Sequence, residues 1–226
     1  MQNPSLEKPY SIREAQQVSV AEGWEPFYLD NVPPPTGGGN PQPVYRPEYK
    51  ELPRTLDAAR VIDGESAQAW FKLKGNIDAG VYQRVAVPAG ATCTFSAHVQ
   101  AWCSNSDNPR VSDGEMYFKV GIDPWGGTDG FADTVRWDGD WYLVRGDYVE
   151  RSVAVVAQEA QITVFVRAWN KWAKKHNDCY LDDCSLTIAG GEPEPPEPPI
   201  PPPGGEFDYE RLARAHEAFA AVLRGG

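Results

Sequence analysis

Residues 80–103, GVYQRVAVPAGATCTFSAHVQAWC, decide the fold because two runs in them alternate between two faces. In the first run Val81, Gln83, Val85 and Val87 share one face. In the second run Cys93, Phe95, Ala97, Val99, Ala101 and Cys103 share one face, and Thr94, Ser96, His98, Gln100 and Trp102 share the other. A period of two is typical of a half-buried strand, and Pro88-Ala89-Gly90 is a turn sequence. The stretch therefore predicts a β-hairpin with its apolar face inward.

Similar short runs, separated by turn residues, recur along the chain. Residues 115–122 place Met116, Phe118, Val120 and Ile122 on one face, and further strands are predicted within 23–29, 60–73, 151–156, 161–168 and 179–188. Between residues 30 and 53, repeated prolines and a glycine triplet exclude a helix or a central strand. That segment predicts a long surface excursion, in which residues 44–51 form an ordered, packed loop. The whole pattern predicts an all-β sandwich.

The composition changes sharply after residue 190. Residues 191–205, GEPEPPEPPIPPPGG, predict an extended proline-rich linker. Residues 206–226 predict a short amphipathic α-helix that Asp208 caps. Its apolar stripe is Tyr209, Leu212, His216, Phe219 and Leu223. Because so short a helix is marginal alone, we expect it to dock on a protein partner, a symmetry mate or its own domain.

The charge balance excludes one class of partner. The chain has 21 basic and 32 acidic residues, a net charge of −11, which repels phosphate backbones and makes nucleic acid an unsuitable ligand. No apolar run is long enough to span a membrane. The N-terminal residues lack the features of a signal peptide, so either export uses another route or a leader is missing from this chain.

The four cysteines leave two alternatives. Cys93 and Cys103 are too far apart along one strand to bridge each other, and the same holds for Cys179 and Cys184. Either bridges join the two strands, for instance Cys93 with Cys184 and Cys103 with Cys179, or all four are buried free thiols.

Several segments resemble a known family when they are taken in order. They are NPSLE at 3–7, RVIDGESAQ at 60–68, residues 80–100 and YLDDCSL at 180–186. Over residues 1–190 the chain resembles carbohydrate-binding modules of the galactose-binding-like jelly-roll superfamily, nearest to families 4, 9 and 22. The resemblance implies a jelly-roll β-sandwich and a non-catalytic domain that binds glycans. Other members bind proteins or lipids, or support a neighbouring domain.

The resemblance also implies a structural calcium ion. Such modules often bind calcium through the Glu of an opening Asn-x-x-Phe-Glu motif and an Asp of the final strand. The matching residues are Glu7 and Asp182, with Leu6 in place of the usual Phe. Carbonyl groups of the turn at Asp63 would complete the six to eight oxygen ligands that Ca²⁺ needs. The alternative is that Asp182 and Asp183 make ordinary turn and backbone hydrogen bonds.

Sugar sites in this group lie on a concave sheet face or in the loops at one end. A tryptophan or tyrosine platform stacks on the C–H face of a pyranose, and polar groups bind its hydroxyl rim. The candidates are Trp125 with Asp123 and Asp129, then Trp137 and Trp141, and then Trp169, Trp172, His176, Asn177 and Asp178. His98, Gln100 and Trp102 on the polar strand face are rivals, and for each tryptophan the alternative is core or edge packing.

The sequence offers no catalytic motif. Gly-x-Ser-x-Gly, His-Glu-x-x-His and P-loop patterns are absent, and no motif selects a carboxylate pair. We therefore predict a protein that is not an enzyme. Three functions remain: a glycan-binding or surface-decoration module anchored by its C-terminal helix, a purely structural virion or surface-assembly protein, and a cargo protein with a tail that docks on a shell. The first is favoured, at a cell exterior or virion surface.

Overall fold

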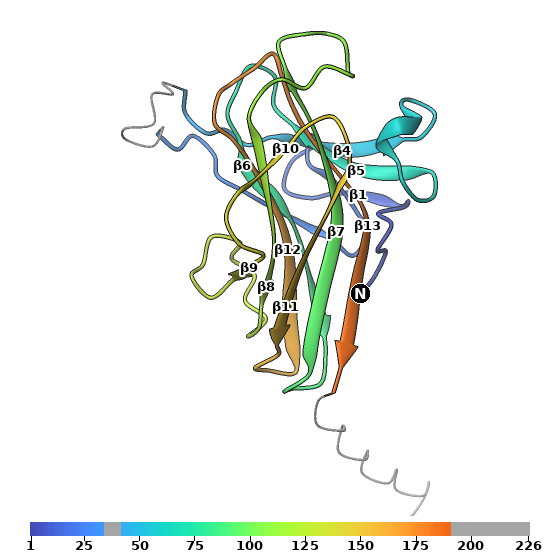
Figure 1. Cartoon of the computed structure of the whole chain (residues 1–226), viewed down its shortest axis with the longest axis vertical. Helices are drawn as coiled ribbons and strands as arrows, with labels where there is room; N and C mark the ends of the chain where they lie inside the picture. Colours follow the sequence, from blue (N-terminus) through green and yellow to red (C-terminus); the bar gives the residue numbers. More distant parts are fainter. Residues whose placement is uncertain (34–41, 191–226) are drawn as a thin grey trace, which may run out of the picture. The chain divides into compact units, whose positions relative to one another are not determined.

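The computed structural model describes residues 1–33 and 42–190, which form an all-β domain with a single 3-10 turn (Figure 1). The all-β sandwich prediction is confirmed. Its elements are β1 Tyr10–Ile12, β2 Ser19–Ala21, β3 Glu25–Tyr28, β4 Glu48–Pro53, η1 Ala58–Arg60, β5 Ser66–Phe71, β6 Asp78–Ala86, β7 Thr92–Ser104, β8 Met116–Asp123, β9 Arg136–Trp137, β10 Tyr142–Val144, β11 Val149–Val156, β12 Gln161–Asn170 and β13 His176–Ala189. The predicted linker and tail helix lie outside the described residues. No helix among those residues is long and apolar enough to cross a membrane.

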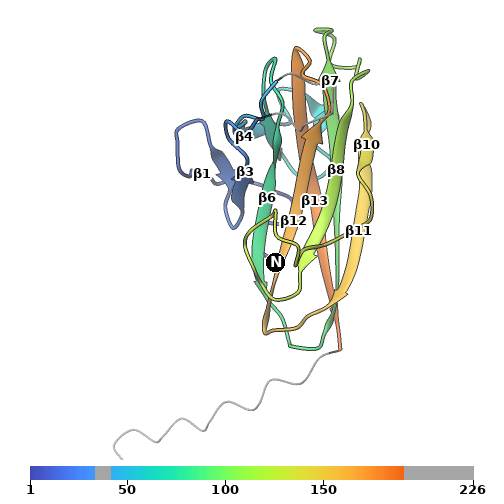
Figure 2. The same cartoon turned by 90° about the vertical axis from the view of Figure 1, so that its left-hand side faces the viewer.

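Two antiparallel sheets make up the sandwich. One has the strand order β10-β8-β12-β6-β3 with β9 paired to β8, and is called the β12 sheet below. The other has the order β11-β7-β13-β5-β4 and is called the β13 sheet. The long strands β7, β8, β12 and β13 run along a common axis (Figures 1 and 2). Of the last two strands of the domain, β12 thus lies at the centre of one sheet and β13 at the centre of the other, each between strands that come earlier in the chain.

The predicted hairpin at residues 80–103 is wrong, because its two strands belong to different sheets. β6 pairs with β3 and β12, whereas β7 pairs with β11 and β13. The connection between them crosses from one sheet to the other, and Ala91 O accepts a hydrogen bond from Ala157 N at 2.8 Å. Alternation shows which face of a strand is buried but not which strand lies beside it. Both apolar faces are buried here by packing across the sandwich.

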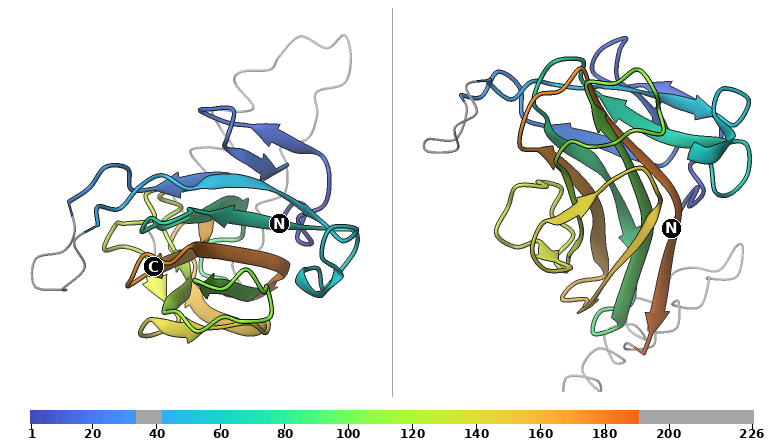
Figure 3. Two further views of the ribbon diagram at one scale, coloured as in Figure 1. Left: turned by 90° about the horizontal axis from the view of Figure 1, so that it is seen from above. Right: turned by 45° about the horizontal axis from the view of Figure 1, so that its top comes forward.

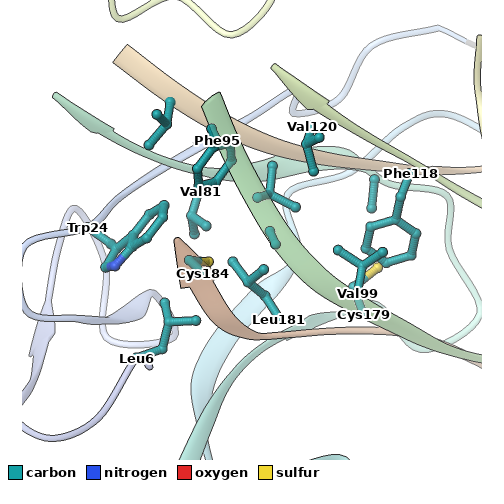
Figure 4. Close-up of a cluster of buried hydrophobic side chains, with 14 of the residues drawn as sticks. Leu6, Trp24, Val81, Phe95, Val99, Phe118, Val120, Cys179, Leu181 and Cys184 are labelled. Atoms are coloured by element: carbon teal, nitrogen blue, oxygen red, sulfur yellow. The ribbon is translucent and has the colours of Figure 1, made fainter. Parts of the chain in front are cut away.

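The inward faces predicted from the alternation are confirmed. Phe95 and Val99 of β7 are 0% exposed and lie among residues of both sheets (Figure 4). Val81 of β6 and Phe118 and Val120 of β8 complete this part of the core. A continuous apolar core therefore fills the space between the two sheets, and the outer face of each sheet is left for other roles.

The segment before β5 is ordered, but it is a strand where the sequence predicted a packed loop. β4 is the edge strand of the β13 sheet and is antiparallel to β5. Its edge position fits the proline at its end. Tyr49 of β4 stacks on Trp70, with ring centroids 6.3 Å apart, and its hydroxyl donates to Gly80 O at 3.0 Å. This contact joins the two sheets.

All four cysteines are free and buried. In the β7–β13 register Cys93 faces Ile188 and Cys103 faces Asn177, so the alternative with bridges is wrong for the described residues. Burial raises the pKa of the Cys103 thiol to about 12. The thiols are small core side chains that are poor nucleophiles at neutral pH.

We expect native protein to show no reaction with Ellman's reagent, and unfolded protein to show four reactive thiols, because the thiolate is the attacking species and all four sites are covered. Absorbance with and without guanidinium, in the absence of reductant, measures both values. Two reactive thiols in the unfolded, unreduced protein would indicate a bridge and contradict the structure.

Candidate functional site

The outer face of the β12 sheet brings together aromatic residues that are distant in the sequence. In β12 the side chains of Ile162, Val164, Val166 and Ala168 lie in the core, so Arg167 and Trp169 alternate to the outside. The register places Trp169 between Tyr117 of β8 and Asp78 of β6. Arg167 lies between Lys119 and Gly80. Every member of this row therefore has a fixed neighbour on each side.

The rings in this row contact one another. Trp169 stacks with Tyr117 at a centroid distance of 5.4 Å and lies 5.9 Å from Trp141, which follows β9. Lys119 Nζ lies 5.0 Å from the centre of the Trp141 ring. Each of these side chains is half-buried, with part of its surface open to solvent. We call the set the tryptophan face; it consists of Asp78, Tyr117, Lys119, Trp137, Trp141, Arg167 and Trp169.

A paired arginine lies beside the rings. Arg167 donates to both carboxylate oxygens of Asp78, from Nε at 2.6 Å and from Nη2 at 2.7 Å. Its Cζ lies 5.3 Å from the centre of the Trp141 ring and 4.4 Å from that of Phe131. A bidentate pair of this kind has a fixed geometry, and the aromatic contacts restrict the guanidinium further. The face thus combines rigid apolar platforms with oriented polar groups.

The loop between β8 and β10 covers the rest of this sheet face. Phe27, Val135 and Phe165 form a second apolar cluster there, against which Phe131 and Trp137 pack. Figure 3 shows this loop (yellow-green) beside the β12 sheet. The side chain of Asp138, which is 1% exposed, fixes the turn after Trp137, because its carboxylate accepts from Val120 N at 3.1 Å and Arg151 Nε at 2.6 Å. Trp137 is therefore the member of the tryptophan face that packs on this cluster, whereas Trp141 contacts Trp169.

The first predicted group does not join this face. Asp123 is buried and organises its own loop by accepting from Trp125 N at 2.8 Å. Trp125 is 45% exposed beneath the Arg136 guanidinium, which lies 5.5 Å from its ring. Asp129 accepts from Phe131 N and lines a separate pocket of about 340 Å³.

Of the last predicted group, Trp169 lies on the tryptophan face, and the other four residues lie in three other places. Trp172 lines a pocket of about 430 Å³ with three lysines. Asn177 is 0% exposed and donates to the carbonyls of Lys72 and Lys174, so its role is structural. His176 and Asp178 belong to the β13 sheet, where His176 stacks on Trp102 at 3.8 Å.

The rival residues on β7 lie on the opposite side of the sandwich from the tryptophan face. His98 Nδ1 lies 3.3 Å from Asp183 Oδ2. Gln100 is 3% exposed and donates to Gly146 O at 2.6 Å. Trp102 lies under the Arg60 side chain, with the guanidinium carbon 5.4 Å from its ring.

Four members of the tryptophan face are absent from the sequence-based candidates: Asp78, Tyr117, Lys119 and Arg167. The available signal was the alternation within residues 116–123 and 161–168. It places Tyr117, Lys119 and Arg167 opposite the apolar face, and hence on the surface that also carries Trp169. Asp78 lies outside both runs, and it is the β6–β12 register that places it beside Trp169.

The predicted calcium ligands meet at one turn. Asp182 is 0% exposed and its Oδ2 accepts from Ile62 N at 2.7 Å, while Glu7 Oε1 accepts from Ser66 N at 3.0 Å. Burial, with a smaller contribution from the Glu7 charge, raises the pKa of Asp182 to about 6. The two carboxylates supply hard oxygen atoms of the kind that calcium binds. In this structure they accept from backbone N–H groups of residues 62–66, which are the turn and backbone hydrogen bonds of the alternative prediction. No group of three or more His, Cys, Asp or Glu in the described part of the chain could hold a metal, so any remaining ligands would be carbonyls or water.

No family model and no curated protein matches the chain. Among solved structures, it is similar to TmCBM61 in complex with beta-1,4-galactotriose (11% identity, 74% of this chain and 88% of that chain, TM-score 0.47). It is also similar to the CBM22-1 xylan-binding domain from Paenibacillus barcinonensis Xyn10C (13% identity, 75% of this chain and 88% of that chain, TM-score 0.41). A third similar structure is the enzymatically active domain of Bacteriophage CBA120 tailspike protein 4 (4% identity, 74% of this chain and 19% of that chain, TM-score 0.43). The similar structures thus include carbohydrate-binding modules, with family 22 among them, as the sequence resemblance names.

Proposed function

We propose that this chain is a non-catalytic glycan-binding module and that the tryptophan face is its binding surface. The observation that carries the proposal is the row of Tyr117, Trp169 and Trp141 on one outer sheet face, beside the bidentate Arg167–Asp78 pair. Aromatic rings match the C–H faces of sugars, and the charged pair can exchange hydrogen bonds with hydroxyl groups.

The charges on this face favour a neutral glycan. Arg167 and Asp78 neutralise each other, and the ammonium group of Lys119, which lies over the Trp141 ring, adds a single positive charge. A row of three rings is longer than a single platform and suits a linear chain of several sugar units better than a lone monosaccharide. Contacts along such a chain add up, although each one is weak.

The test is a microarray of plant, microbial and animal glycans, probed with the full chain. Calorimetry with the best hit then gives the affinity. We expect signals for neutral linear oligosaccharides and quenching or shifting of tryptophan fluorescence on binding. The absence of signal on the array, together with no retardation in gels that contain soluble polysaccharides, would overturn the proposal.

We further propose that calcium binds beside Glu7 and Asp182 and ties the N-terminal segment to β13. The support is the convergence of both carboxylates on residues 62–66, and the like charge between them that a cation would offset. When bound, the ion would supply a cross-link between distant parts of the chain. Its role would be stability rather than chemistry.

We expect saturating calcium to raise the melting temperature by about 5–10 °C over that in EDTA, since ligand at a hundred times its Kd adds about 2.7 kcal/mol. In Asp182→Asn the increment should vanish, because a charged ligand is lost. Asp183→Asn is the matched control. The side chain of Asp183, the next residue, is 45% exposed, and this variant should keep the calcium-dependent increase in melting temperature. Equal melting temperatures of the wild type in calcium and EDTA would contradict the site.

We also propose, from sequence alone, that the predicted tail helix anchors the module to a larger assembly. The support is the apolar stripe from Tyr209 to Leu223 behind a proline-rich linker. A chain ending at residue 205 should keep its melting temperature and its glycan binding while losing co-purification with the assembly. Retained co-purification would contradict the anchor. Capture of a shell protein by the isolated tail would instead favour the cargo function.

A further inference from the structure

A second pocket lies on the outer face of the β13 sheet, on the other side of the sandwich from the tryptophan face. Its volume is about 330 Å³. Strands β4, β5, β7 and β13 supply its floor, and the η1 loop (cyan in Figures 1 and 3) borders it. We call it the Arg60 pocket. The residues that line it include Lys50, Leu56, Asp57, Arg60, Leu73, Trp102 and Asp178.

Arg60 is held rigidly in the wall of this pocket. The residue is 3% exposed, and its Nε donates to Asp57 Oδ2 at 3.1 Å. Its Nη2 donates to Pro109 O at 2.9 Å. The guanidinium carbon lies 4.1 Å from the centre of the Tyr180 ring and 5.4 Å from that of Trp102. Two hydrogen bonds and two aromatic contacts thus fix the orientation of a buried cation.

Three polar atoms around the pocket are unpaired. Among the described residues, Arg60 Nη1, Trp102 Nε1 and Asp178 Oδ1 are buried without a hydrogen-bond partner. Trp102 and Asp178 are cross-strand neighbours in the β7–β13 register. A buried polar group that makes no hydrogen bond costs about 1–3 kcal/mol, so three around one pocket need an explanation. Together they offer two donors and one acceptor.

The chemistry of these atoms defines the ligand. The cations Arg60 and Lys50 are balanced by the anions Asp57 and Asp178 among the lining residues, so an ionic ligand gains little. A pair of adjacent hydroxyl groups fits, because one can donate to Asp178 Oδ1 while both accept from the two N–H groups. The volume is at the low end for ligand pockets, which suits one small ring.

We propose that the Arg60 pocket binds a single neutral sugar unit through two adjacent hydroxyl groups, as a second site independent of the tryptophan face. The three unpaired atoms are themselves covered, so the sugar reaches them after a small shift of the lining side chains. Leu56 and Leu73, which are 69% and 58% exposed, line the pocket and can contact the C–H face of the ring. The inference does not rest on the proposed function of the tryptophan face.

The indole N–H of Trp102 is a direct reporter of this site. The test records ¹H–¹⁵N spectra of the full chain with methyl glycosides of glucose, galactose, mannose and xylose, each up to about 100 mM, which detects Kd values in the millimolar range. Trp102→Phe assigns the resonance by its loss. We expect at least one glycoside to shift the Trp102 indole signal in a saturable way, with the Trp141 and Trp169 indoles unchanged.

Variants separate this site from the tryptophan face. Asp178→Asn should weaken the glycoside at least about tenfold, since it replaces the charged acceptor. Trp169→Ala should leave glycoside binding unchanged while it lowers polysaccharide binding. Arg60→Lys keeps the charge but loses the planar guanidinium with its several N–H donors, so it should also weaken binding. Circular dichroism and melting temperatures check that each variant folds.

Three outcomes would overturn the inference. One is that no glycoside shifts the Trp102 indole, which would mean that water alone satisfies the unpaired atoms. The second is that glucuronate or inorganic phosphate shifts it and neutral glycosides do not, which would make the pocket an anion site. The third is that Trp169→Ala and Asp178→Asn weaken the glycoside equally, which would place it elsewhere.

Discussion

Replacing Trp169 by alanine is expected to weaken binding of the best glycan at least about 30-fold. Trp169 occupies the centre of the tryptophan face, 5.4 Å from Tyr117 and 5.9 Å from Trp141. Truncation of a central aromatic anchor costs about 2 kcal/mol or more, and 1.4 kcal/mol is a tenfold change in Kd. Calorimetry on the wild type and the variant measures the ratio.

The matched control is Trp125→Ala. Trp125 is 45% exposed, and its ring lies against the Arg136 guanidinium rather than against the tryptophan face. We expect it to change the affinity by less than about twofold. Melting temperatures of both variants exclude a loss through unfolding. Wild-type affinity in Trp169→Ala at an unchanged melting temperature would mean that the glycan binds elsewhere.

The face that each strand buries could be predicted from the sequence, because every second residue had to be apolar. Phe95 and Val99 are the clearest cases, and both are 0% exposed. The neighbours of each strand could not be predicted in the same way. β13 inserts between β5 and β7 from far along the chain, and such pairing depends on contacts that no local pattern records. That is why the hairpin prediction at residues 80–103 is wrong.

The candidate site could be predicted only in fragments. Trp137, Trp141 and Trp169 are conspicuous in the sequence, but the β8–β12 register and the loop before β10 are what bring them together. Asn177 and Asp123 lie close to tryptophans in the sequence and yet are buried, because loops need their hydrogen bonds. Sequence proximity to an aromatic residue is thus a weak guide to a shared surface.

Replacing Gly80 by alanine is expected to lower the free energy of unfolding by about 3 kcal/mol or more and the melting temperature by about 6–12 °C. Gly80 lies in β6 between Phe27 of β3 and Arg167 of β12. A Cβ at this position would lie 1.8 Å from Val166 O, a backbone atom of a central strand. Relief of that clash requires β6 and β12 to separate locally, with loss of ladder hydrogen bonds beneath the tryptophan face.

Gly146→Ala is the matched control for this prediction. A Cβ on Gly146 would meet none of the described atoms within 4 Å, and its φ is outside the left-handed range. The same added methyl group should therefore change the free energy of unfolding by no more than about 0.5 kcal/mol. Thermal and urea unfolding of the two variants separates the effect of the site from that of glycine replacement itself. Equal stability of the two variants would mean that β6 and β12 do not approach as closely as the β12 sheet requires, and the register that sets Trp169 beside Tyr117 would then be in question too.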